Sequence, residues 1–114
     1  MRQLTNEEIR ILKDQSCWAE DWTNIHVSED FKPNYMHRVM LYGEIHIGDF
    51  EKNIEVSRGF FKHTGINNAT LRNVTIGDNC LIENIGNYIN NYTIGDDCYI
   101  SNVSAMETTE GATY

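Results

Sequence analysis

The clearest pattern of hydrophobic and polar positions lies between Leu71 and Met106, where the chain repeats itself after eighteen residues. Written as two lines, this stretch reads LRNVTIGDNCLIENIGNY and INNYTIGDDCYISNVSAM, and eight of the eighteen columns are identical. The Ile-Gly-Asp-x-Cys sequence of the first line recurs in the second at the same place. A repeat of this kind predicts stacked structural units, because a single unit cannot cover its own apolar side.

A weaker period of six runs inside the repeat. It places large apolar or aromatic residues at Ile76, Ile82, Tyr88, Ile94, Ile100 and Met106. Three sides of six residues predict one triangular turn of chain, and each turn would pair with the next as a parallel strand ~4.8 Å away. We therefore expect Ile76 to stack on Ile94 in the core. A small antiparallel β-sandwich is the alternative, but a sandwich gives no reason for a motif repeated at a fixed offset.

The N-terminal residues 1–15 show the pattern of a short helix. Thr5 and Glu8 have the spacing of a capping box, in which each side chain binds the backbone N–H of the other residue. We expect this helix to cover the first strand layer, since stacked repeats need protected ends.

The remaining boundaries divide one structural domain into three parts. Residues 1–35 are predicted to form the helix and an irregular cap, and residues 36–106 to form about four coils of parallel strands. A bulge or loop is expected at residues 58–65, where the six-residue pattern fails. Residues 107–114 read as a tail that continues into further coils.

Composition narrows the classes of partner. The 114 residues contain 17 acidic and 9 basic side chains, for a net charge of −8. This balance disfavours nucleic acid and anionic membranes as partners. The sequence has no apolar run of membrane-spanning length and begins without a signal peptide, so a cytoplasmic location is expected. We expect the three cysteines to be reduced, and no Cys or His spacing suggests a metal site.

The hexapeptides IGDNCL and IGDDCY resemble those of the hexapeptide-repeat family, with an aliphatic residue, then Gly, and a small residue at the fifth place. The resemblance implies an all-β fold, a single-stranded left-handed parallel β-helix with a short N-terminal α-helical cap. The chain as a whole resembles the N-terminal part of large uncharacterised bacterial hexapeptide-repeat transferase-like proteins.

The same resemblance implies acyltransferase chemistry, with a histidine as general base and acetyl-CoA as the acyl donor. His63 is the first candidate for that base and His46 the second, since a neutral imidazole suits deprotonation near pH 7. His26 and His37 have no supporting context. The bases expected to meet a cofactor phosphate are Lys52, Arg58 and Lys62.

Two interpretations of function follow. In the first, the chain is part of an acyl- or sugar-nucleotide-related transferase and has no activity as this fragment. In the second, it is a non-catalytic β-helical scaffold or assembly module, for which self-association or continuation of the same stack is expected. A cleft that holds His63 and a cation would favour the enzyme, whereas a solvated, isolated His63 would favour the scaffold.

Overall fold

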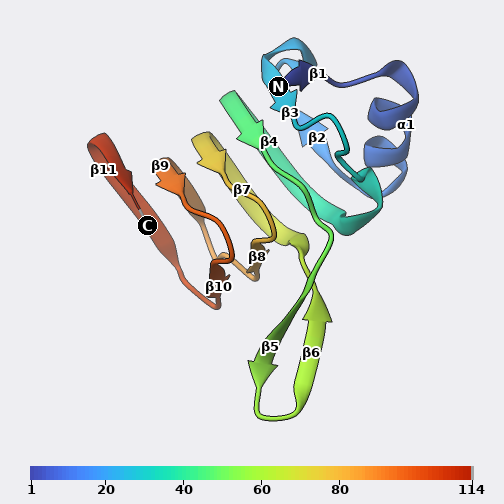
Figure 1. The fold of residues 1–114 in the computed structure, drawn as a ribbon. Coiled ribbons are helices and arrows are strands. Elements are labelled where there is room, and N and C mark those ends of the chain that lie inside the picture. Colours follow the sequence, from blue (N-terminus) through green and yellow to red (C-terminus); the bar gives the residue numbers. More distant parts are fainter. Residues whose placement is uncertain (114) are drawn as a thin grey trace.

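The computed structural model describes residues 1–113, without the side chains of residues 107–112. In these residues α1 spans Asn6–Asp14, and two short 3-10 helices, η1 and η2, span Trp22–Asn24 and Pro33–Tyr35. Thr5 caps α1, and the capping box with Glu8 is confirmed. Figure 1 shows α1 beside the first strands of the sheet. None of the described helices is long and apolar enough to cross a membrane.

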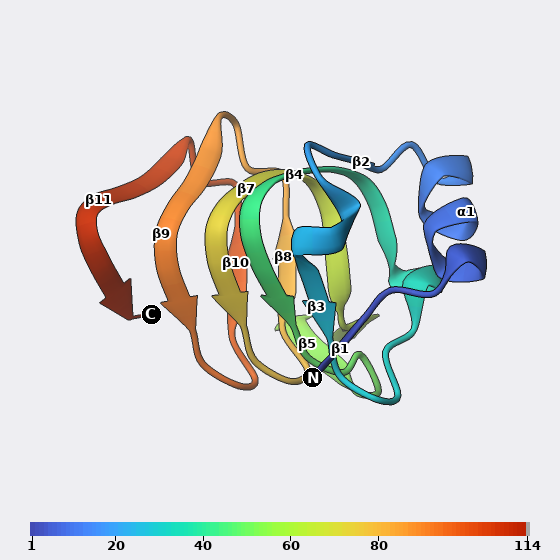
Figure 2. The same ribbon diagram turned by 90° about the horizontal axis from the view of Figure 1, so that it is seen from above.

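Within residues 1–113, nine strands form one sheet, and two more form a separate hairpin (Figures 1 and 2). The sheet contains β1 (Arg2–Gln3), β2 (Trp18–Ala19), β3 (Ile25–Val27), β4 (Met36–Ile47), β7 (Gly65–Ile76), β8 (Leu81–Glu83), β9 (Tyr88–Ile94), β10 (Tyr99–Ser101) and β11 (Ala105–Thr113). In the described part of the chain, β1 is antiparallel to β3 and the other pairings of this sheet are parallel.

The hairpin lies between β4 and β7 in the sequence. It consists of β5 (Asn53–Ser57) and β6 (Phe60–His63), and its turn falls in the region where a loop was expected. Figure 1 shows it projecting away from the large sheet. Phe60 and Phe61 leave 70% and 62% of their surface exposed there. Self-association remains a prediction.

The register confirms the expected pairing of the two repeat lines. Ile76 lies opposite Ile94, and Ile82 lies opposite Ile100, each pair separated by eighteen residues and parallel. The spacing between β4 and β7 is longer. Ile76 also pairs with Ile47, which lies twenty-nine residues earlier in the sequence. The inserted hairpin accounts for this difference.

The predicted fold class is wrong. The described residues form a mixed α/β structure with one α-helix, a nine-stranded, mostly parallel sheet and a two-stranded hairpin, not an all-β left-handed parallel β-helix of about four coils. The eighteen-residue repeat governs only the later strands. Before residue 71, the chain forms the antiparallel β1, the helix and the inserted hairpin, and none of these elements has the eighteen-residue repeat. The expected tail, residues 107–114, begins inside β11, and Tyr114 lies outside the described residues.

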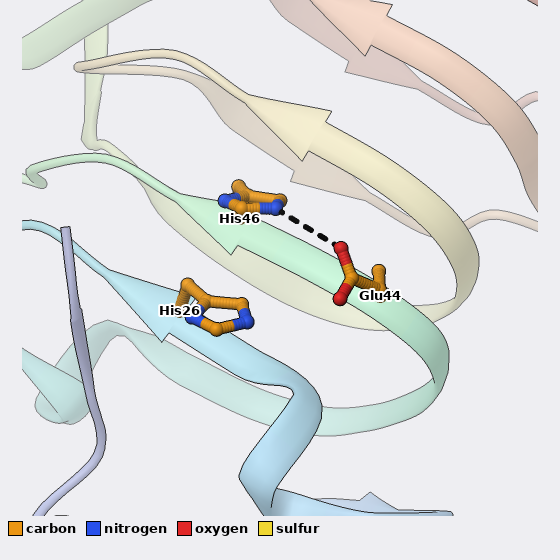
Figure 3. A group of neighbouring side chains, drawn as sticks. All are labelled: His26, Glu44 and His46. Carbon is orange, nitrogen blue, oxygen red and sulfur yellow. Dashed lines mark ion pairs between the residues drawn. The ribbon is translucent and has the colours of Figure 1, made fainter.

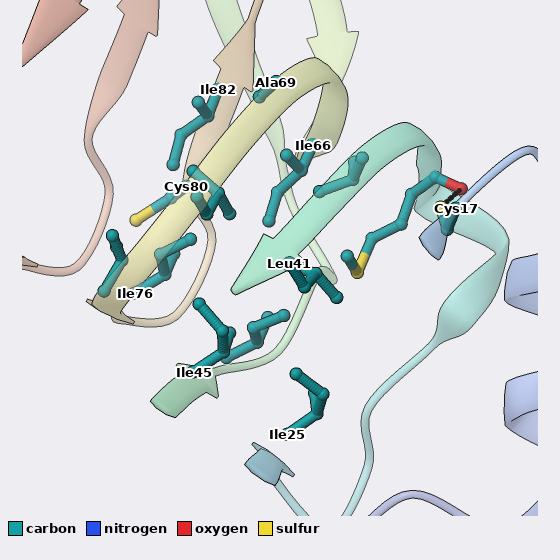
Figure 4. Packing of buried hydrophobic residues seen from close by; sticks show 14 of the residues in the cluster. Cys17, Ile25, Leu41, Ile45, Ile66, Ala69, Ile76, Cys80 and Ile82 are labelled. Atoms are coloured by element: carbon teal, nitrogen blue, oxygen red, sulfur yellow. Dashed lines mark hydrogen bonds between the residues drawn. The ribbon is translucent and has the colours of Figure 1, made fainter. Parts of the chain in front are cut away.

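The core is a set of apolar ladders that run across the parallel strands (Figure 4). In one ladder, Val27, Ile47, Ile76 and Ile94 pair in succession, and each is at most 1% exposed. Burying a side chain of this size stabilises the fold by about 1.5–3 kcal/mol relative to an exposed position. The hydrophobic effect therefore selects the register, since a shift by one residue would turn every ladder towards solvent.

The polar part of the repeat also has a structural cause. Asp96 accepts a hydrogen bond from the backbone N–H of Asp78 at 2.7 Å, and Asp78 accepts one from Asp49 at 2.9 Å. A Cβ at Gly77 would collide with the Asp96 carboxylate, so glycine must precede Asp78. The repeated asparagines Asn73, Asn84, Asn91 and Asn102 all adopt positive φ, which asparagine tolerates better than most residues.

Candidate metal centre

The structure places His63, the first candidate for a catalytic base, at the end of β6. Its ring stacks on Tyr35, with centroids 3.7 Å apart and planes within 13°. Nδ1 lies 2.8 Å from the carbonyl oxygen of Thr64, so Nδ1 carries the proton and donates it. This imidazole is a half-buried packing element in a fixed tautomer.

The three bases expected near a cofactor do not form one group with His63. Lys62 binds the buried carboxylate of Glu83 at 3.2 Å, and Lys52 lies 3.9 Å from Asp97. Arg58 is exposed in the turn of the hairpin. Among the described residues, none of these bases pairs with His63. The catalytic and cofactor roles assigned to these side chains therefore remain predictions.

His46, the second candidate, lies in a different setting. Its neighbours Ile45 and Ile47 are fully buried, so the alternation of β4 turns His46 outward. Parallel pairing of β3 with β4 sets His26 directly opposite His46. Their rings stack with centroids 4.8 Å apart and planes within 17°.

A carboxylate completes this group. Glu44 lies two residues before His46 on β4, and one of its oxygens is 3.6 Å from Nε2 of His46. Figure 3 shows the three side chains together, with Glu44 reaching towards the two rings. One ligand atom from each side chain lies within 4.8 Å of the other two. The three residues are called the His-His-Glu centre below.

The spacing suits a small cation. An ion bonded at ~2.0–2.1 Å to nitrogen or oxygen holds tetrahedral donors ~3.4 Å apart, close to the Glu44–His46 separation. The two rings are nearly parallel, so one imidazole must rotate about χ2 to aim its lone pair at a shared ion. Neither His26 nor His46 is fully buried, and 35% of the His46 side chain is exposed, which leaves room for this rotation.

A second group, made of Asp30, Asp49 and Glu51, is less suited to an ion. Asp49 accepts a hydrogen bond from the Ser28 hydroxyl, and Glu51 pairs with Lys32 at 3.3 Å. Its donors are carboxylates alone, two of them already bonded. The His-His-Glu centre differs because it combines two imidazoles with one carboxylate, and the described side-chain contacts of these three residues are with one another.

The two buried cysteines, Cys17 and Cys80, do not add a ligand. Burial raises the pKa of the Cys80 thiol to about 11, and its Sγ lies 3.0 Å from the carbonyl oxygen of Gly95. Cys17 is buried as well, and burial raises its pKa. Both thiols stay protonated near neutral pH, and a thiol must lose its proton to bind a metal. Cys17, Cys80 and Cys98 form no disulfide in the described structure, and their redox state remains a prediction.

Comparison with known proteins assigns the whole chain to a family. A family model for a domain of unknown function, DUF4954, matches residues 1–114. The chain belongs to the DUF4954 family. No curated protein and no solved structure matches it.

The DUF4954 match replaces the earlier resemblance. Membership of the hexapeptide-repeat family, and the transferase-like description that came with it, are contradicted by the family model and by the mixed sheet. The physical reason lies in the motif itself. Ile-Gly-Asp-x-Cys combines a buried ladder position, a close approach at Gly77 and a carboxylate that binds backbone. The parallel stacking of strands in this DUF4954 chain requires those features, so the motif does not indicate transferase activity.

Sequence reasoning overlooked His26 and Glu44 because the relevant contact is not local. The signal that could have found it is the similarity of Ile25-His26-Val27 to Ile45-His46-Ile47. Two apolar-His-apolar segments in parallel strands put both imidazoles on one face if they pair in register. That pairing could not be read from the repeat, which begins only at Leu71.

Proposed function

We propose that this DUF4954 domain binds a divalent transition-metal ion, with Zn²⁺ as the reference ion, at the His-His-Glu centre. The observation that supports the proposal is the convergence of His26, His46 and Glu44 within 4.8 Å. Two imidazoles and a carboxylate match the donors that Zn²⁺ uses in proteins, whereas Ca²⁺ and Mg²⁺ prefer oxygen alone.

The position of the centre supports a structural role for the ion. Its ligands come from β3 and β4, so a bound ion joins the three-residue strand β3 to the long strand β4. β3 also pairs with β1, and through it the ion would tie the N-terminus to the sheet. A ligand at 100 times its Kd stabilises the folded state by ~2.7 kcal/mol.

Three protein ligands leave one coordination position open in a tetrahedral site. Glu44 is mainly exposed, with 66% of its side chain accessible, so water can reach that position. The proposal therefore describes a metal-stabilised module of a larger function, and no reaction is assigned to the ion.

The experiment is a calorimetric titration of the metal-free domain with Zn²⁺. The wild-type chain should bind one ion, and binding should raise the temperature of unfolding. His26→Ala and His46→Ala should each weaken binding at least tenfold, because each removes one of three ligands.

His37→Ala is the matched control, since His37 also lies on β4, is half-buried and bonds to Asn67 instead of the centre. It should keep the wild-type affinity. Equal affinity in the His26→Ala and wild-type chains, or loss of binding only in the His37→Ala chain, would reject the proposal.

A further inference from the structure

A second candidate site lies on the sheet surface formed by β4, β7 and β9, which run side by side in Figure 2. It is a hollow of about 250 Å³ lined by Tyr42, Thr70, Arg72, Tyr88 and Asn90. Tyr42, Arg72 and Asn90 occupy one row across the three strands. Thr70 and Tyr88 lie two residues earlier on their strands and so share that face.

The hollow is distinct from the His-His-Glu centre. The register of β4 against β7 shifts between Tyr42 and Ile45, and Gly43 adopts positive φ there. Tyr42 precedes this irregularity, whereas Glu44 and His46 follow the bend at Gly43. The two sites can therefore be tested separately.

Asn90 supplies the first indication of a ligand. Its side-chain oxygen is buried and has no hydrogen-bond partner in the described structure. An unpaired buried acceptor is unfavourable, and such groups are rare in native proteins. A rotation of the Asn90 amide would turn this oxygen into the hollow, where a hydroxyl or N–H donor from a bound molecule would satisfy it.

Arg72 supplies the second indication of a ligand. Residues 71–114 contain six acidic side chains and one basic side chain, which is Arg72. Its side chain is exposed and forms no ion pair with the described residues. A guanidinium binds a carboxylate through two parallel hydrogen bonds, so an anionic group is the natural partner for this position.

Two tyrosines, Tyr42 and Tyr88, contribute aromatic surface to the lining of the hollow. Tyr42 and Tyr88 lie on strands separated by β7 and two residues apart in register, which puts their backbones ~12 Å apart at the usual strand spacing and rise. Trp18 extends the aromatic surface of Tyr42, with its ring 5.3 Å from that of Tyr42 and 45% of its surface exposed. Aromatic faces separated in this way suit an extended ligand made of rings with an apolar side.

We propose that this surface binds a chain of acidic sugars, with a uronic acid residue in the hollow. The carboxylate of the sugar pairs with Arg72, a ring hydroxyl donates to the Asn90 oxygen, and the apolar faces of the sugar rings pack on Tyr42 and Tyr88. A neutral sugar lacks the anion for Arg72, and a small aromatic acid reaches only one of the two tyrosines. Free and polymeric uronates present the same carboxylate and hydroxyl groups. The two separated tyrosines favour the polymer over a single sugar.

The test titrates the full chain with trigalacturonate, and in parallel with galacturonate, the neutral maltotriose and benzoate, followed by calorimetry and ligand-observed NMR. Trigalacturonate should bind with a Kd below ~1 mM and galacturonate more weakly. Maltotriose and benzoate should bind at least tenfold more weakly than trigalacturonate. Affinity should fall as salt rises, because a charge pair contributes.

Two variants and one control complete the design. Arg72→Gln should weaken trigalacturonate binding at least tenfold, and Asn90→Leu should weaken it without changing the salt dependence. Lys13→Gln removes an exposed base on α1 and should leave affinity unchanged. If Asn90→Leu does not fold, Arg72→Gln still decides, since Arg72 is exposed. Equal binding of maltotriose, tighter binding of benzoate, or an unaffected Arg72→Gln chain would overturn the proposal.

Discussion

Thr64 offers a sensitive check of the packing, because the structure buries its hydroxyl without a partner. The side chain is 0% exposed, and its oxygen has no hydrogen bond in the described residues. Its backbone is fully engaged, since the N–H donates to Lys52 at 2.9 Å and the carbonyl accepts from His63 at 2.8 Å. The residue thus fixes the junction between the hairpin and β7 while carrying an unsatisfied polar group.

The expected effect of Thr64→Val follows from these contacts. Valine has nearly the shape of threonine and keeps both branches, so the packing and the backbone bonds remain. A buried hydroxyl without a partner costs about 1–3 kcal/mol, and its removal should raise the free energy of unfolding by about 1 kcal/mol. Thr64→Ala also removes a methyl group, and the cavity it leaves should make this chain about 1 kcal/mol less stable than Thr64→Val.

Urea unfolding followed by circular dichroism measures the difference. With an m value of about 2 kcal/mol per molar urea, the Thr64→Val midpoint should rise by about 0.5 M, with m unchanged. A midpoint below that of the wild type would show that the hydroxyl makes a stabilising hydrogen bond. The packing described around the hairpin junction would then be wrong.

Two further predictions concern the ladders and the helix. Ile94→Asp places a charge at a position that is 1% exposed, and the domain should lose its cooperative unfolding transition; a folded, soluble variant would contradict the Ile76–Ile94 ladder. The hydrogen bond from Arg2 lowers the pKa of Glu8, so the stabilisation it provides is complete above the unfolded pKa and is lost as pH falls through the lower folded pKa. Glu8→Gln keeps a capping side chain but removes this charge, so its stability should fall less steeply than that of the wild type between about pH 5 and pH 3, and equal slopes in the two chains would refute the assignment.

Sequence reasoning succeeded where the relevant contacts are local or repeated. The capping box of Thr5 and Glu8 spans four residues, and the pairing of Ile76 with Ile94 follows from an identity at a fixed offset. In each case one interaction decides the outcome and the residues that make it can be read directly.

Sequence reasoning failed where the pairing of strands depends on segments that lie far apart in the sequence. The repeat was extended back to residue 36, but the hairpin between β4 and β7 changes the spacing from eighteen to twenty-nine residues. The fold class was therefore taken from less than half of the chain. The candidate site suffered for the same reason, because His26 meets His46 only through the pairing of β3 with β4.

The most direct test of the proposed function is the position of the ion. A crystal of the metal-free domain, soaked in Zn²⁺ and measured at the zinc absorption edge, yields an anomalous difference map. We expect one strong peak ~2.0–2.1 Å from a ring nitrogen of His26 and of His46, with Glu44 as the third ligand. A peak at Asp30, Asp49 and Glu51 instead, or no peak between the two imidazoles, would contradict the account.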